Sequence, residues 1–332
     1  MRWGETGSFK SAVAGLQGSV LRKSLWQIIN TILPYAALFG LMFWAQDVSY
    51  WLTLPLAVLT AGFMIRTFII FHDCTHGSFF RSPRANHVLG FITGVLTFTP
   101  YHHWRHQHAL HHASSGDLDG RGAGDIWTLT VQEYLAAPLW KRIIYRLFRN
   151  PLILFVIVPT FVFLIYHRFP ARAVGKRERR SVHWTNGALL AIVVLMSLTV
   201  GVKSYLLVQL PVLMITGAVG LWLFYVQHQF EGVYWERSGH WDFATAALDG
   251  SSFYKLPRIL QWFTGSIGFH HIHHLSPAIP NYNLEACHKA SPIFRKVRAI
   301  TLWSSTKALS LRLWDEQRKR LVGWSSFRKS LQ

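Results

Sequence analysis

Six apolar stretches run through this chain of 332 residues and determine what kind of fold it can adopt. A transmembrane helix needs about 20 apolar residues, and the stretches 52–71 and 205–227 reach that length. The stretches 28–45 and 187–202 are shorter but still long enough for a span in a locally thinner bilayer. The sequence therefore predicts an all-α integral membrane protein with four transmembrane helices.

The other two apolar stretches, 88–101 and 151–167, are not expected to cross the membrane. The first is too short for a span. The second is followed by a basic loop, 168–180, which the positive-inside rule places in the cytosol. The segment before 151–167 is also expected in the cytosol. Both ends of 151–167 would then lie on the cytosolic side of the membrane. We therefore expect 151–167 to be in-plane or re-entrant.

These assignments predict a single domain, 1–332, built from two helical hairpins. The hairpins pair 28–45 with 52–71 and 187–202 with 205–227. Residues 102–150 and 229–332 are expected to form a helical cap on the cytosolic side. Within it, Leu and Trp alternate with Lys and Arg at helical spacing from Thr301 to Trp324, which indicates a helix lying on the membrane or packed on the cap.

Charge and cysteine content narrow the class of protein. The formal net charge is +19, from 34 Lys and Arg against 15 Asp and Glu. We attribute this excess to positive-inside flanks and attraction to anionic headgroups, because no compact basic domain for nucleic acid stands apart from the apolar segments. The two cysteines, Cys74 and Cys287, are far apart in sequence, which argues against a disulfide framework and is compatible with a reducing compartment.

Three histidine motifs flank the predicted spans: His72-Asp-Cys-Thr-His76, His108-Ala-Leu-His111-His112 and His270-His-Ile-His273-His274. Spacings of three and four residues place side chains on one face of a helix, and imidazole is a common ligand of transition metals. Eight such ligands exceed what one four-coordinate zinc ion takes, so we expect a pair of ions. Spacing alone leaves iron, copper, zinc and nickel open.

The three motifs, with paired spans between the first and the last, resemble those of the membrane fatty acid desaturase family and are most similar to bacterial acyl-lipid desaturases. The resembling segments are HDCTHGSFF (72–80), HALHHASSGDLDGRGAGDIWTLTVQEYL (108–135), WLFYVQHQFE (222–231), LDGSSFYKLP (248–257) and GFHHIHHLSPAIPNYNLE (268–285). The resemblance implies that a histidine on the last span, here His228, completes the ligand set. Where stearoyl-CoA desaturases carry an asparagine four residues earlier, this chain has Phe224.

The resemblance implies a metal centre of two iron ions with O₂ as co-substrate, and no catalytic residue beyond the metal ligands. The expected ligands are His72, His76, His108, His111, His112, His228, His270, His273 and His274. The reaction would place a cis double bond in acyl chains of membrane phospholipids, with electrons from a separate ferredoxin or flavodoxin. The implied location is the cytoplasmic (inner) membrane, with the site on its cytosolic side.

Three other functions remain open from the residues alone. A di-iron hydroxylase or ketolase acting on alkyl or carotenoid substrates can use the same histidine spacing. A bis-histidine haem protein would place its histidines within the spans, whereas these motifs lie at span ends and beyond. A metal transporter should carry polar residues at mid-membrane, and the last span offers little beyond Gln209 and Thr216.

Several neighbouring residues have weaker predicted roles. We expect His102, His103, His106 and His271 not to be ligands, and Cys74 to be a packing residue. Four aspartates can either orient imidazoles or shape turns: Asp73, Asp117, Asp119 and Asp125. On the resemblance, Asn283 and Glu285 are expected to lie beside the ligands. Candidate walls of an acyl tunnel, or else core residues, are Phe79, Phe80, Trp222 and Phe224.

Overall fold

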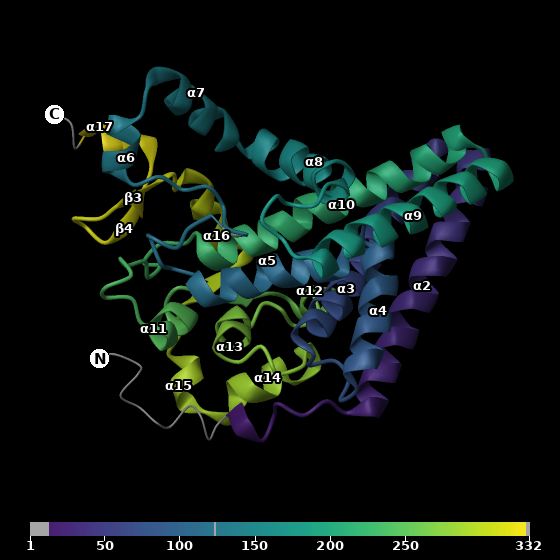
Figure 1. Ribbon diagram of the computed structural model, residues 1–332, viewed down its shortest axis with the longest axis horizontal. Coiled ribbons are helices and arrows are strands. Elements are labelled where there is room, and N and C mark those ends of the chain that lie inside the picture. Colours follow the sequence, from purple (N-terminus) through teal and green to yellow (C-terminus); the bar gives the residue numbers. More distant parts are fainter. Residues whose placement is uncertain (1–12, 123, 330–332) are drawn as a thin grey trace.

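The computed structural model describes residues 13–122 and 124–329, and the described chain is mostly helical (Figure 1). The predicted all-α class is confirmed, with sheet limited to two short strand pairs. Four helices are long and apolar enough to cross a membrane: α2 (Leu21–Val48), α3 (Tyr50–His76), α9 (Lys176–Thr199) and α10 (Val202–His228). Each coincides with one of the four predicted spans.

The long helices form two hairpins, as predicted. Ser49, with extended backbone, separates α2 from α3, and Gly201, with a positive φ of 84°, precedes α10. At its other end α3 stops at Gly77, whose left-handed backbone (φ 71°) favours glycine. Helices α3 and α10 pack directly on each other, which brings the ends of the two hairpins together.

The two other apolar stretches adopt shorter elements. The first forms α4 (Pro83–Leu96), which begins with Ser82 as its N-cap. The second contains a π-helical turn (Ile153–Ile157), α8 (Val158–Leu164) and a 3₁₀ turn (Tyr166–Arg168). Helix α7 (Leu139–Phe148) precedes it at an angle of 69°. By length and composition this bent pair would be a fifth span if it crossed, so the in-plane or re-entrant placement stays a prediction.

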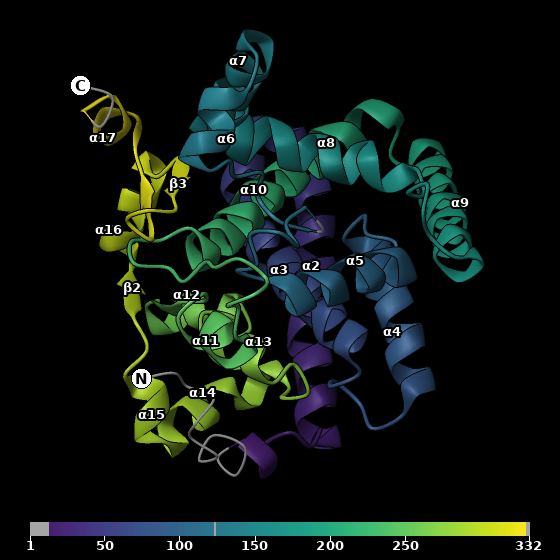
Figure 2. The ribbon, with the colours of Figure 1, turned by 60° about the vertical axis from the view of Figure 1, so that its left-hand side comes forward.

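The remaining elements gather around the ends of α3 and α10. They include α5 (Tyr101–Ser114), α6 (Val131–Ala136), α11 (Phe243–Leu248), α12 (Arg258–Phe263), α13 (His270–Leu275), α14 (Asn281–Ala290) and α15 (Pro292–Arg295). Strands β1 (Phe253–Lys255) and β2 (Ala299–Thr301) pair in parallel. Figure 2 shows α4, α5 and α9 to one side of α10, and α12 and β2 to the other.

The predicted C-terminal helix between Thr301 and Trp324 is wrong. That stretch contains α16 (Leu302–Ser305), a 3₁₀ turn (Thr306–Ser310), and the antiparallel strands β3 (Leu313–Asp315) and β4 (Arg320–Val322), followed by α17 (Trp324–Lys329). Trp314 is buried and stacks on Trp235, with ring centroids 5.7 Å apart. Long-range packing of this kind overrides a local helical pattern.

A buried arginine ties the cap to the end of the last span. Arg149 follows α7 and is 1% exposed. Its guanidinium donates to the Tyr225 hydroxyl (3.0 Å), the Gln229 side-chain oxygen (3.2 Å) and the Leu311 carbonyl (2.9 Å). Two of these partners, Tyr225 and Gln229, flank His228 along the chain, so Arg149 connects the cap to the end of α10.

Candidate metal centre

Nine histidines from four helices meet where α3 and α10 end. The last turns of α3 provide His72 and His76, and α5 provides His108, His111 and His112. The short helix α13 provides His270, His273 and His274, and His228 is the last residue of α10. The structure thus brings together all nine of the predicted ligands, although their role as ligands remains a proposal.

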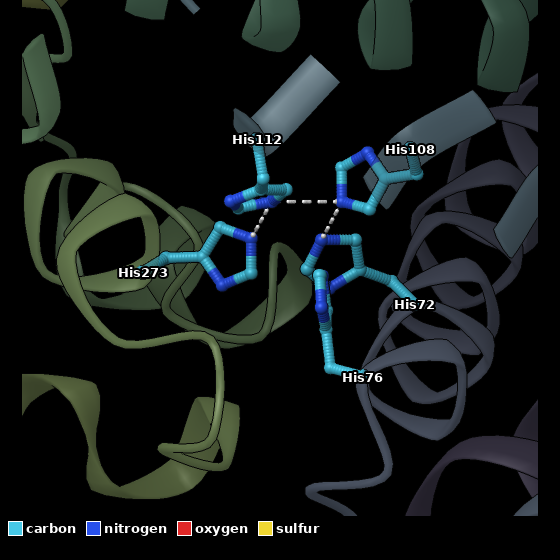
Figure 3. A group of neighbouring side chains, drawn as sticks. All are labelled: His72, His76, His108, His112 and His273. Carbon is cyan, nitrogen blue, oxygen red and sulfur yellow. Dashed lines mark hydrogen bonds between the residues drawn. The ribbon is translucent and has the colours of Figure 1, made fainter. Parts of the chain in front are cut away.

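Five of these histidines form the first group: His72, His76, His108, His112 and His273. One ring nitrogen from each lies within 4.8 Å of the others, and the rings point toward a common centre (Figure 3). The Nε2 atoms of His108 and His72 are 2.9 Å apart, and those of His108 and His112 are 3.1 Å apart. Helix α13 closes the group, with 3.0 Å between the Nε2 atoms of His273 and His112.

A second group lies beside the first. It contains His111, His228 and His274, whose ring nitrogens also lie within 4.8 Å of one another. His270 joins them, because its Nε2 atom is 2.9 Å from that of His228 and 3.1 Å from that of His274. The rings of His112 and His274 stack at 4.2 Å, so the two groups are in direct contact.

Helix geometry explains why each H-x-x-H-H motif contributes to both groups. Successive residues are about 100° apart around a helix, so residues four apart differ by only about 40°. His108 and His112 therefore face the first group together, while His111 is turned toward the second. In α13 the division is reversed: His270 and His274 face the second group and His273 the first.

The donor set fits metal ions. Nitrogens bound to one ion at about 2.0–2.1 Å and at right angles are about 3 Å apart, close to the separations seen in both groups. The Nε2 atom of His76 is buried and has no hydrogen-bond partner among the described residues. A buried ring nitrogen without a partner, facing four others, is a site for a cation.

Three acceptors fix the orientation of imidazoles in the cluster. Asp125 lies 2.8 Å from Nδ1 of His111, and Asp73 lies 3.3 Å from Nδ1 of His72. The Gly250 carbonyl lies 3.3 Å from Nδ1 of His228. An Nδ1–H bond to an oxygen leaves Nε2 unprotonated, and Nε2 is the atom that each ring turns toward its group.

A sequence model described as Fatty acid desaturase matches residues 49–304, which include both histidine groups. The chain belongs to the fatty acid desaturase family. It is 49% identical over 316 residues to a "Fatty acid desaturase" of Bacillus subtilis, an alignment that covers 95% of this chain and 90% of the relative.

More distant members of the desaturase family have names that specify acyl lipids. The "sn-1 oleoyl-lipid 12-desaturase" of Synechocystis is 28% identical over 72% of this chain and 68% of its own length. The "sn-2 acyl-lipid omega-3 desaturase (ferredoxin), chloroplastic" of Arabidopsis thaliana is 27% identical over 82% of this chain and 63% of its own length.

Burial keeps five histidines of this desaturase-family site uncharged. In the cap, burial is the main cause that lowers the imidazole pKa values well below their usual range, and repulsion from neighbouring imidazoles adds to it. The affected residues are His108, His112, His270, His273 and His274. Neutral imidazole is the form that binds metal, so these rings need not lose a proton at neutral pH.

Phe224, which stands where stearoyl-CoA desaturases have an asparagine, borders the second group. Its ring centroid is 5.1 Å from those of His111 and His228. A cavity of about 20 Å³ opens beside it, lined also by Asp125 and Gln229, and this volume is enough for one water molecule. The other three predicted tunnel residues, Phe79, Phe80 and Trp222, belong to core clusters.

The histidines predicted not to be ligands lie outside both groups. His103 is buried and accepts from the Ala171 amide (3.2 Å), and His102 accepts from Arg177 (3.4 Å). His106 is exposed. His271 points away from the cluster, toward His288 at 3.3 Å, and burial lowers its pKa to about 3. Cys74 is buried, as expected of a packing residue.

Some predicted supporting residues do not contact the cluster. Asp117 and Asp119 bind Ser238 and Arg237 instead. The prediction that Asn283 and Glu285 lie beside the ligands is also wrong. Helix α14 turns both side chains toward other partners: Asn283 to the Leu16 carbonyl, and Glu285 to Lys289.

A neighbouring residue on α14 has the supporting role. Asn281 donates to the Asp73 carboxylate from its backbone nitrogen (2.7 Å) and from its side-chain Nδ2 (2.8 Å). It therefore holds the carboxylate that faces His72. The pair is separated by 208 positions in sequence, so no local pattern could have revealed it.

Proposed function

We propose that this chain is an O₂-dependent di-iron fatty acid desaturase that introduces a cis double bond into acyl chains of membrane lipids. The observation that carries the proposal is the convergence of nine histidines, six of them buried, in two adjacent groups at the ends of helices that are long and apolar enough to span a membrane. Membership of the family and the acyl-lipid substrates in the names of two relatives support it.

The proposed reaction removes one hydrogen from each of two adjacent methylenes. Two electrons from the donor and two protons join with these two hydrogens and O₂, giving one C=C bond and two water molecules. Iron would supply the redox chemistry that activates O₂ and breaks unactivated C–H bonds, which side-chain acids and bases cannot do. In this proposal His72, His76, His108, His112 and His273 hold one ion, and His111, His228, His270 and His274 hold the other.

The protein's own contribution is position and exclusion of water. His111, His273 and His274 are 1–2% exposed, so these rings are screened from solvent. Asp73 and Asp125 hold protons on Nδ1 of their histidines and thereby keep Nε2 free. Such fixed ligand geometry is what a metal centre needs from its protein.

The partners and the location complete the proposal. A separate ferredoxin or flavodoxin would deliver the electrons, and the name of the Arabidopsis relative specifies ferredoxin. The basic loop 168–180 supports a cytosolic site in the cytoplasmic membrane. Nucleic acid has no part in the reaction.

The test is lipid analysis of a desaturase-free bacterium that expresses the chain. We expect new unsaturated fatty acids with the unmutated protein and none with His111→Ala, while the exposed His106→Ala matches the unmutated protein. Purified protein should contain two irons per chain and no Soret band. Unchanged fatty acids would contradict the proposal, and oxygenated products without new double bonds would support a hydroxylase or ketolase instead.

A further inference from the structure

The short helix α12 packs against the middle of a transmembrane helix. The ring of Phe263 lies over Gly62, where an added Cβ would come within 2.9 Å of it. The rings of Phe263 and Trp262 stand 5.2 and 5.8 Å from that of Phe63. Because Phe63 is halfway along α3 (Tyr50–His76), α12 lies well away from the end that carries the histidines.

The position of Phe63 along α3 gives an estimate of how deep α12 lies in the bilayer. Trp51, in the first turn of α3, is 80% exposed, as expected for a tryptophan at the interface opposite the histidine cluster. At about 1.5 Å per residue, Phe63 is about 18 Å further along the helix. The hydrocarbon core is about 30 Å thick, so Phe63 and α12 lie beyond the midplane, within the leaflet nearer the histidine cluster.

The outer face of α12 suits that depth. The exposed Arg258 at its first position has a long side chain that can extend its guanidinium toward the interface. The large apolar side chains of α12 are exposed: Ile259 by 67%, Leu260 by 39% and Trp262 by 38%. In water these three side chains would form an exposed apolar patch. Beside α3 they extend its lipid-facing apolar surface. Both ends of the segment return to the histidine side, because the Tyr254 amide donates to the Gly268 carbonyl (2.7 Å).

Arg66 connects α12 to the transmembrane helices. This arginine of α3 is 7% exposed, and no ion pair involves it among the described residues. Its guanidinium donates to the Thr31 hydroxyl of α2 (3.1 Å) and to the Trp262 carbonyl, and lies 4.0 Å over the Trp262 ring. A cation inside a span is costly without partners, and α12 provides two of them.

We propose that residues 256–268 are a re-entrant element that enters the leaflet nearer the histidine cluster and contacts lipid acyl chains through Ile259, Leu260 and Trp262. The sequence had assigned this segment to the polar cap. The inference stands on packing depth and exposure, so it is independent of the proposed reaction. The element ends two residues before His270, so the lipid-facing surface leads into the third histidine motif.

Fluorescence quenching of the full-length protein in nanodiscs tests the proposal. An NBD fluorophore is attached to Ile259→Cys and, as a second position, to Leu260→Cys. The lipid reference is Val58→Cys on α3, which is 60% exposed, and the aqueous reference is Lys319→Cys between β3 and β4. The native thiols of Cys74 and Cys287 are buried, and unmutated protein measures their background labelling.

We expect fluorophores at 259 and 260 to be quenched by nitroxide-labelled phosphatidylcholine as strongly as the one at 58, and several-fold less by aqueous iodide than the one at 319. Quenching like that at 319 would place α12 in water and overturn the proposal. Protection from both quenchers would also overturn it, because a protein surface or a second copy would then cover α12.

Discussion

The two histidine groups differ in how completely protein nitrogens surround their centres. The first group has five histidines, two of them from the end of α3, and their rings close on one point. The second has four, and the ring of Phe224 and a water-sized cavity occupy its open side. Five imidazoles therefore enclose the first group, whereas a cavity of about 20 Å³ borders the second.

The two groups also differ in the surroundings of the carboxylate that orients an imidazole ring in each. In the first group, the Asp73 carboxylate lies 3.3 Å from Nδ1 of His72 and accepts a hydrogen bond from Asn281. Asp125 acts on the second group at 2.8 Å and is only partly buried, with 18% of its side chain exposed. The first group is therefore more enclosed by protein than the second, and four experiments test this difference.

The largest effect is expected from removing one ligand in each group. His112→Ala in the first group and His274→Ala in the second should each lower desaturation by roughly 100-fold or more, because each removes a proposed ligand to one ion. Metal analysis should find about one iron lost per chain in each variant, with no loss in His106→Ala. Two irons retained by either variant would show that the division into two groups is wrong.

Acid should destabilise the metal-free protein. Burial lowers the pKa values of His108, His112, His270, His273 and His274 in the folded state, below the value of about 6.5 in the unfolded chain. Stability is then complete above pH 6.5 and decreases as the pH falls toward the folded values, by about 1.4 kcal/mol per pH unit for each proton.

The measurement is thermal unfolding of chelator-treated protein between pH 8 and pH 5. The iron-loaded protein should depend less on pH until protons displace the metal. A melting temperature of the metal-free protein that does not change over this range would argue against buried neutral imidazoles in both groups.

A smaller, selective effect is expected from the orienting carboxylates. Asp125→Asn should weaken iron binding in the second group by roughly 10- to 100-fold, because His111 loses its charged acceptor. Asp73→Asn is the matched change for the first group. Chelator competition should show one weakened iron in each variant, and equal loss of both irons in Asp125→Asn would mean that the sites are not separable.

The smallest effect is expected at Phe224. Phe224→Asn places an amide oxygen beside His111 and His228, where it can bind the ion directly or through water. We expect the second iron to leave a few-fold more slowly under chelation and the first to be unaffected, with Phe224→Leu as control. The expected factor is small because a neutral hydrogen bond or weak ligand contributes about 1 kcal/mol. Faster loss than in the control would show that the open side does not admit a ligand.

The long helices and the identity of the histidines that meet could be predicted from the amino-acid sequence. Apolar runs encode spans because a helix in lipid must satisfy its own backbone, and all four predicted spans are long apolar helices in the structure. Histidines three and four residues apart share a helix face, because the regular turn of the helix fixes where each side chain points. These features depend on local sequence, so the sequence is enough to predict them.

Helix packing, by contrast, sets which histidines group together and what surrounds them. His111 and His112 are adjacent in sequence yet belong to different groups, because the rotation of α5 against α3, α10 and α13 sets where each ring points. Asn281 reaches Asp73 across the chain, and Phe263 places α12 against the middle of α3. Such contacts follow from the packing of whole helices, and no stretch of sequence encodes them alone.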